Sequence, residues 1–81
     1  MTPISKETRS QENFAYLLGL VIRNRNKNAA MLSSYDLCVN DALNLCVAGD
    51  YDEARKRLLR AFQYSVGILH RDYPLAVELA S

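Results

Sequence analysis

Apolar side chains recur every three or four residues along much of the chain, which is the spacing of an amphipathic helix. The first such segment begins near residues 8–10 and reaches residue 22. Its regularly spaced apolar residues are Phe14, Leu17, Leu18, Val21 and Ile22. The intervening Ala15, Tyr16 and Leu20 make this arc broader than one face of a surface helix requires. We therefore expect either the most buried helix of the domain or a helix that also contacts a partner.

A polar run of alternating basic and amide residues, 23–28, interrupts this pattern. Basic side chains complement the negative end of a helix, and asparagine is a frequent helix terminator. We predict a break here, although the helix could also continue through residues 29–32. Residues 1–8 precede the first helix and are expected to be a frayed lead-in.

Two further helical segments are predicted, the first over residues 35–48 and the second from Asp50 to residue 71. The apolar stripe of the first consists of Tyr35, Cys38, Val39, Ala42, Leu45 and Cys46. One face of the second carries Ala54, Leu58, Ala61, Phe62, Ser65, Leu69 and Tyr73, with Ile68 beside it. Ser33 or Ser34 is expected to cap the first of these two helices, because serine accepts hydrogen bonds from free backbone N–H groups.

The segment 48–54 reads as a helix stop followed directly by a helix start. Gly49 has no Cβ and can adopt the left-handed conformation that ends many helices. Asp50 and Glu53 fit a capping box, in which each side chain accepts a hydrogen bond from a free N–H group. Asp52 and Glu53 also place negative charge at the positive end of the new helix. The pattern predicts a helical hairpin over residues 35–71.

Pro74 is expected to end the last long helix and to open a short helix over residues 75–80. Leu75, Val77 and Leu79 would pack this short helix onto the hairpin. The 81 residues contain only three glycines and two prolines, which argues against an all-β fold. We therefore predict a single all-α domain over residues 1–81, in which a helical hairpin packs with an N-terminal helix and a short C-terminal helix.

Residues 35–68 resemble one tetratricopeptide repeat, a pair of antiparallel helices that cross closely through small residues. Ala42 matches the small residue of its first helix, and Gly49-Asp50-Tyr51 matches its turn. Its second helix has a small, large, small pattern that corresponds to Ala54, Leu58 and Ala61. The departures from the repeat are Cys38, Asp41, Leu45 and Val66, the last of which replaces a terminating proline, so this helix is expected to run on. The turn is also similar to that of the microtubule-interacting-and-trafficking domain, and both resemblances imply a helical hairpin.

Composition and charge narrow the class of protein further. The formal charge of +1 gives no strong attraction to nucleic acid or to membranes. The longest apolar run, 14–22, is much shorter than the ~20 residues that a membrane-spanning helix needs. The polar N-terminal segment contains an acid, unlike a secretory signal. We expect a cytoplasmic protein that does not bind membranes.

The residues that could carry catalysis are few. Cys38 and Cys46 lie on one predicted helix with Cα atoms about 12 Å apart, which is too far for a disulfide. They are expected to be buried thiols in a reducing compartment, with an intersubunit disulfide as the alternative. His70 is expected to act as a cation near a helix C-terminus rather than in proton transfer. We expect no metal, no cofactor and no enzymatic activity.

Two basic clusters form one candidate binding surface. The first consists of Arg55, Lys56, Arg57 and Arg60, and the second of Arg23, Arg25 and Lys27. They could be solvated helix faces, with ion pairs from Asp52 to Lys56 and from Glu53 to Arg57. They could also bind an acidic protein segment or, in a third interpretation, nucleic acid.

The broad apolar arc is the other candidate surface. Its partner-binding residues would be Phe14, Leu17, Leu18 and Val21. Large exposed apolar patches mark interfaces, and homodimers commonly use the same patch on both copies. The expected function is a small protein–protein interaction module, such as an adaptor, chaperone or inhibitor of a larger protein, acting as a homodimer. The alternative is a small nucleic-acid-binding regulator that uses both basic clusters.

Overall fold

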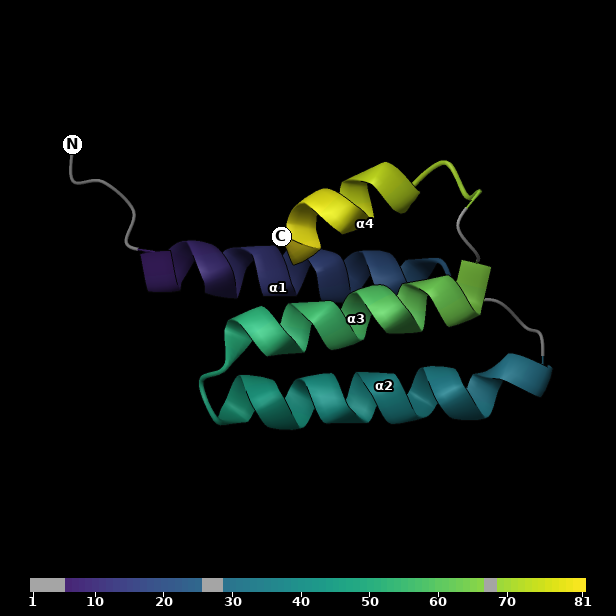
Figure 1. Ribbon diagram of the computed structural model, residues 1–81, viewed down its shortest axis with the longest axis horizontal. Helices are drawn as coiled ribbons and strands as arrows, with labels where there is room; N and C mark the ends of the chain where they lie inside the picture. The colour runs from purple at the N-terminus through teal and green to yellow at the C-terminus, as the bar shows by residue number, and fades with distance from the viewer. Residues whose placement is uncertain (1–5, 26–28, 67–68) are drawn as a thin grey trace.

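The predicted all-α fold is confirmed by the computed structural model, which describes residues 6–25, 29–66 and 69–81 (Figure 1). These ranges contain four helices and no strand. The helices are α1 (Lys6–Arg23), α2 (Ala29–Val47), α3 (Tyr51–Val66) and α4 (Tyr73–Ala80). Residues 1–5, 26–28 and 67–68 lie outside the described residues, and with them the predictions on Lys27, on Ile68 and on most of the lead-in.

Helix α3 is the centre of the arrangement. It packs against each of the other three helices, and α4 packs against both α1 and α3. Figure 1 shows α3 between α1 and α2, with α1 and α3 running in the same direction and α2 running against them. The molecule measures 46 × 27 × 16 Å.

The core lies along both sides of α3. From α3 it contains Ala54, Leu58, Ala61, Phe62 and Ser65. From the other helices it contains Phe14, Leu17, Leu20, Val21, Tyr35, Cys38, Ala42, Ala76 and Ala80. Each large apolar side chain contributes about 1.5–3 kcal/mol when it is fully buried. Ala42 and Ala54 are fully buried, and such small side chains let helix axes approach closely.

The turn between α2 and α3 combines a helix stop with a helix start, as predicted. Gly49 has a φ of 87°, the Asp50 N–H donates to the Leu45 carbonyl at 2.9 Å, and the Gly49 N–H donates to the Cys46 carbonyl at 3.0 Å. These two hydrogen bonds form a Schellman motif. The Glu53 N–H donates to Asp50 Oδ1 at 3.3 Å, which is one arm of the predicted capping box. The other arm is replaced, because the Asp50 N–H already bonds Leu45.

The predicted break between the first two helices is confirmed, but both helices begin earlier than predicted. Helix α1 ends at Arg23, where the Asn24 side-chain amide donates to the Leu20 carbonyl at 3.0 Å. It begins at Lys6 rather than near residues 8–10. Helix α2 begins at Ala29 rather than Tyr35. The residues that extend it, 29–32, are mostly strong helix formers, and the predicted serine caps lie inside the helix.

The predicted extension of α3 to residue 71 is wrong. Helix α3 ends at Val66, and residues 69–72 form a turn that leads to α4. Leu69, which was expected on the buried face, is therefore fully exposed. His70 lies in this turn and not in the last turn of a helix. Its Nδ1 accepts a hydrogen bond from the Asp72 N–H at 3.1 Å, and its ring meets Phe62 edge-on at 5.7 Å.

The short C-terminal helix is present and has Pro74 in its first turn, as predicted. Its buried residues differ in part from the prediction, although Leu79 is partly buried against the core as predicted. Ala76 and Ala80 face the core, whereas Leu75 and Val77 are exposed. Small side chains on the inner face allow this short helix to lie close to both α1 and α3.

Candidate functional site

The predicted apolar partner surface on α1 is largely part of the core. Phe14, Leu17 and Val21 are buried, and Leu18 is half-buried against the same core. These side chains are covered because α1 packs against α3 and α4 within one chain. A partner cannot contact the three buried residues in this fold, so their assignment as partner-binding residues is wrong. The large apolar residues that α1 exposes are Tyr16 and Ile22.

The structure separates the predicted basic clusters. Arg23 and Arg25 lie at the C-terminal end of α1, and both are exposed. Arg25 faces Asp36 at 3.7 Å, and its guanidinium lies 5.5 Å from the centre of the Tyr35 ring. On α3, Lys56 and Arg60 are exposed and Arg57 is half-buried.

Ion pairs on α3 also differ in part from the prediction. Glu53 faces Arg57 at 4.0 Å, as predicted, and it also faces Lys56 at 3.7 Å. Asp52 does not pair with Lys56 but with Arg55, at 2.6 Å. This exchange of partners follows from the position of Arg55, which points toward α1 and not into solvent.

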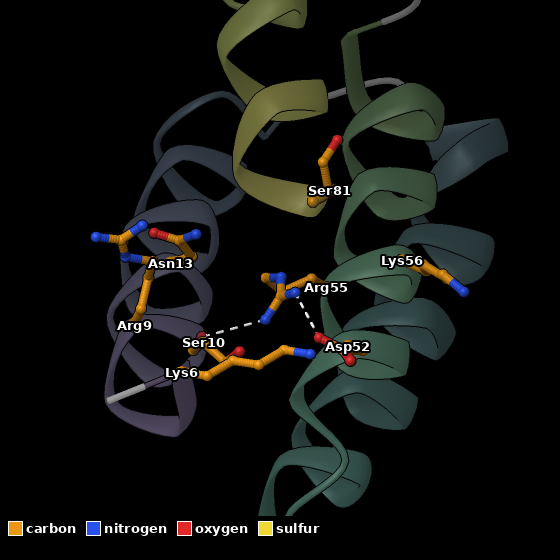
Figure 2. A pocket seen from close by; sticks show the side chains of 9 residues that line it. Lys6, Arg9, Ser10, Asn13, Asp52, Arg55, Lys56 and Ser81 are labelled. Atoms are coloured by element: carbon orange, nitrogen blue, oxygen red, sulfur yellow. Dashed lines mark hydrogen bonds and ion pairs between the residues drawn. The ribbon is translucent and has the colours of Figure 1, made fainter. Parts of the chain in front are cut away.

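Arg55 is the residue whose placement differs most from the prediction, because it is only 5% exposed. One terminal nitrogen, Nη2, donates to Asp52 Oδ1 at 2.6 Å, and Nη1 donates to the Ser10 carbonyl of α1 at 3.4 Å. Its Nε is buried and has no hydrogen-bond partner among the described residues. Figure 2 shows the side chain spanning the space between α3 and α1. The shared direction of α1 and α3 makes this bridge possible, because it places their first turns side by side.

A pocket of about 430 Å³ lies between the first turns of α1 and α3 and the end of α4 (Figure 2). We call it the basic pocket; it is lined by Lys6, Arg9, Ser10, Asn13, Asp52, Arg55, Lys56, Ala80 and Ser81. The Lys6 side chain extends across the opening toward Asp52, and Arg9 lies beside Asn13 on α1. The Lys56 side chain points away from the opening. Lys6, Arg9 and Arg55 therefore supply positive charge, against the single acid Asp52.

The helix ends add to this positive character. Lys6 and Arg9 lie in the first turn of α1, where the helix dipole is positive and a nearby cation costs roughly 0.3–1 kcal/mol. Neither side chain has an ion-pair partner among the described residues. Sequence patterns did not single out these two bases, because they are more than 40 residues away from Arg55 in the chain. Only the packing of α1 beside α3 brings the three together.

Two buried groups have raised pKa values. Burial raises the pKa of the Cys38 thiol and that of the Tyr35 phenol, because each loses the solvation of its charged form. The Tyr35 hydroxyl donates to the Val21 carbonyl at 3.4 Å, which ties α2 to α1. Both cysteines are free, with Cys38 buried and Cys46 partly buried. A buried thiol with a raised pKa forms little thiolate and reacts slowly.

Neither a protein-family model, a curated protein nor a solved structure matches the chain. The resemblance of residues 35–68 to a tetratricopeptide repeat therefore stays a prediction, although α2 and α3 do form a hairpin. Among the helices that the structure describes, none combines the length and the apolar character needed to cross a membrane.

Proposed function

We propose that this chain is a small protein-binding domain whose basic pocket binds an acidic segment of a partner protein. The observation that supports this function is Arg55, a buried base that lines a surface pocket and holds a donor without a partner among the described residues. A buried donor without a hydrogen bond costs about 1–3 kcal/mol. The Arg55 side chain also makes two hydrogen bonds and packs between α1 and α3, so it stabilises the fold as well, and its place in the wall of the basic pocket is what supports a site for carboxylates.

The three bases would act in different ways. Arg55 is held by Asp52 and by the Ser10 carbonyl, so its charge is fixed in position before a ligand arrives. Lys6 and Arg9 belong to the rim, where long side chains attract acidic groups from solution and adapt to them. A segment with two or more carboxylates could contact the rim bases and the fixed guanidinium together.

The alternative, nucleic acid, gains less support from the same residues. None of the nine residues that line the basic pocket is aromatic, so bases would have no ring to stack on. Arg25 and Arg57 already face acids of their own chain. Nucleic-acid binding therefore stays the competing hypothesis, and it predicts affinity that falls steeply with added salt.

The proposal is tested with a fluorescent glutamate-rich peptide and the variant Arg9→Glu. Arg9 is exposed, so the reversal leaves the core intact while it changes the charge of the pocket rim. We expect peptide binding to weaken at least fivefold, which corresponds to about 1 kcal/mol, measured by fluorescence anisotropy. Arg71→Glu is the matched control, because the Arg71 side chain is 92% exposed in the turn at the other end of the molecule.

Two results would contradict this function. Equal weakening by Arg9→Glu and Arg71→Glu would mean that the peptide senses net charge and not the basic pocket. Tighter binding of a duplex or single-stranded oligonucleotide than of the peptide, with a steep loss in salt, would favour the nucleic-acid hypothesis instead.

A further inference from the structure

One exposed stripe of α1 has a self-complementary pattern. It consists of Glu12, Tyr16, Gly19 and Arg23, which we call the α1 seam. These residues stand at positions i, i+4, i+7 and i+11, so they follow one line along the helix, about 16 Å long. The spacing reads the same in both directions. An acid stands at one end and a base at the other, with the largest and the smallest side chain between them.

The side chains of the α1 seam are available for contact. Tyr16 is 71% exposed, and Glu12 and Arg23 are exposed without an ion-pair partner among the described residues. The surface beside Gly19 is hollowed, with a volume of about 370 Å³ and walls that include Leu75 and Leu79 of α4. A Cβ atom on Gly19 would meet nothing within 4 Å. The seam thus has an exposed aromatic ring beside a hollow whose walls are mostly apolar and include Tyr16 and Arg23 of the same chain, and Gly19 adds no side chain to it.

We propose that two copies of this chain associate through the α1 seam, with the two α1 helices antiparallel about a two-fold axis. This arrangement sets Glu12 opposite Arg23 of the second copy and Tyr16 opposite Gly19 of the second copy. Each tyrosine ring enters the hollow of the other chain, and two ion pairs close the ends. The same patch serves both copies, as in most homodimers. A parallel arrangement would instead oppose like charges at both ends and place the two tyrosine rings against each other.

The antiparallel dimer has a consequence for the basic pocket. Each pocket lies at the N-terminal end of α1, so the two pockets of a dimer are placed at opposite ends of the paired helices. The proposed dimer does not depend on the acidic partner proposed for the basic pocket. A monomer that binds the acidic peptide refutes the dimer alone, and a dimer that does not bind it refutes the pocket alone.

Charge reversal tests the dimer, with sedimentation equilibrium as the measurement. Glu12→Arg places a base opposite Arg23 of the second copy at both ends of the seam, and Arg23→Glu opposes two acids in the same way. We expect each variant alone to dimerise at least tenfold more weakly than the original chain. Glu7→Arg is the matched control, because Glu7 is exposed on another face of α1 and its reversal leaves the dimer unchanged.

Mixing the two variants supplies the decisive result. Glu12→Arg and Arg23→Glu chains restore both ion pairs when they combine, so a mixture is expected to form a heterodimer with affinity near that of the original homodimer. Misfolding of either variant cannot produce this recovery. The inference is overturned if the original chain is monomeric at every concentration studied, or if neither reversal weakens its dimer.

A third variant tests the apolar centre of the seam. Gly19→Leu fills the hollow that receives Tyr16, while the open space around Gly19 lets the monomer fold. We expect this chain to keep its helix content by circular dichroism and to dimerise at least tenfold more weakly. A dimer that is unaffected by this substitution would place the interface elsewhere.

Discussion

At the scale of single residues, Arg55 shows how packing changes the environment and the role of a basic side chain. It belongs to a run of three bases on α3, and such runs are usually solvated. Here its methylene groups lie between α1 and α3, and its guanidinium reaches Asp52 and Ser10. The methylene groups of the Arg55 side chain contribute apolar packing, and its guanidinium charge contributes to the basic pocket. These two contributions can be separated by substitution.

Arg55→Met is predicted to keep the fold and to lose the acidic ligand. Methionine retains an unbranched apolar side chain and removes a buried donor that has no partner among the described residues. We expect the free energy of unfolding in urea to change by less than about 1 kcal/mol, while glutamate-rich peptide binding falls at least fivefold. Arg55→Ala is the comparison, because it also removes the packing and should lower stability by about 2 kcal/mol or more. Equal destabilisation by both variants would mean that the guanidinium hydrogen bonds dominate.

At the scale of helices and turns, the two described glycines have opposite roles. Gly49 has a positive φ of 87° and ends α2, so a side chain there is strained. Gly19 lies inside α1, where glycine weakens a helix and where a Cβ would meet nothing within 4 Å. One glycine is required by the backbone, and the other lowers the stability of its helix.

Replacing each of these two glycines with alanine is predicted to change the free energy of unfolding in opposite directions. Gly49→Ala should lower the free energy of unfolding by about 1 kcal/mol or more, because alanine disfavours the left-handed conformation. Gly19→Ala should raise it by about 0.5–1 kcal/mol through helix propensity. Thermal unfolding at high dilution, where the chain is monomeric, measures both. Destabilisation by Gly19→Ala would contradict the open environment assigned to this position.

At the scale of the whole molecule, stability depends on α3 and on the core along its two sides. Helix α2 packs on α3, and its buried Cys38 faces this core. Because burial raises the pKa of the Cys38 thiol, the folded chain holds the thiol proton to higher pH than the unfolded chain does. Between the two pKa values the unfolded state binds fewer protons, so the free energy of unfolding falls as pH rises.

A loss of stability at alkaline pH is therefore predicted. It should begin near the ordinary thiol pKa of about 8.5 and should be measured by urea unfolding between about pH 7 and pH 9.5. Cys38→Ala is expected to be less stable at neutral pH and to lose less stability across this range. Cys46→Ala is the control, because Cys46 is only partly buried. An unchanged pH dependence in Cys38→Ala would rule out this thiol as the cause.

The sequence by itself determined the helical class, the stop and start at Gly49, the break after Arg23 and most of the buried face of α3. These features depend on local spacing and on backbone preferences within a few residues, which a sequence displays directly. Helix limits were less well determined. The early start of α2 follows the helix-forming residues 29–32, which the prediction placed before the helix, and helix ends are the least sharply defined part of any helix.

Only the tertiary structure decided which residues are exposed and which are buried. Because α1 packs beside α3, the side chains of Phe14, Leu17 and Val21 are buried and that of Arg55 points inward. The local sequence pattern around each of these four residues is also compatible with a surface position. The same packing joined Arg55 with Lys6 and Arg9, which nothing in their sequence spacing connects. It also left the stripe from Glu12 to Arg23 exposed. A binding surface is formed by residues distant in the chain, so its location depends on the relative placement of whole helices and not on the spacing within any one of them.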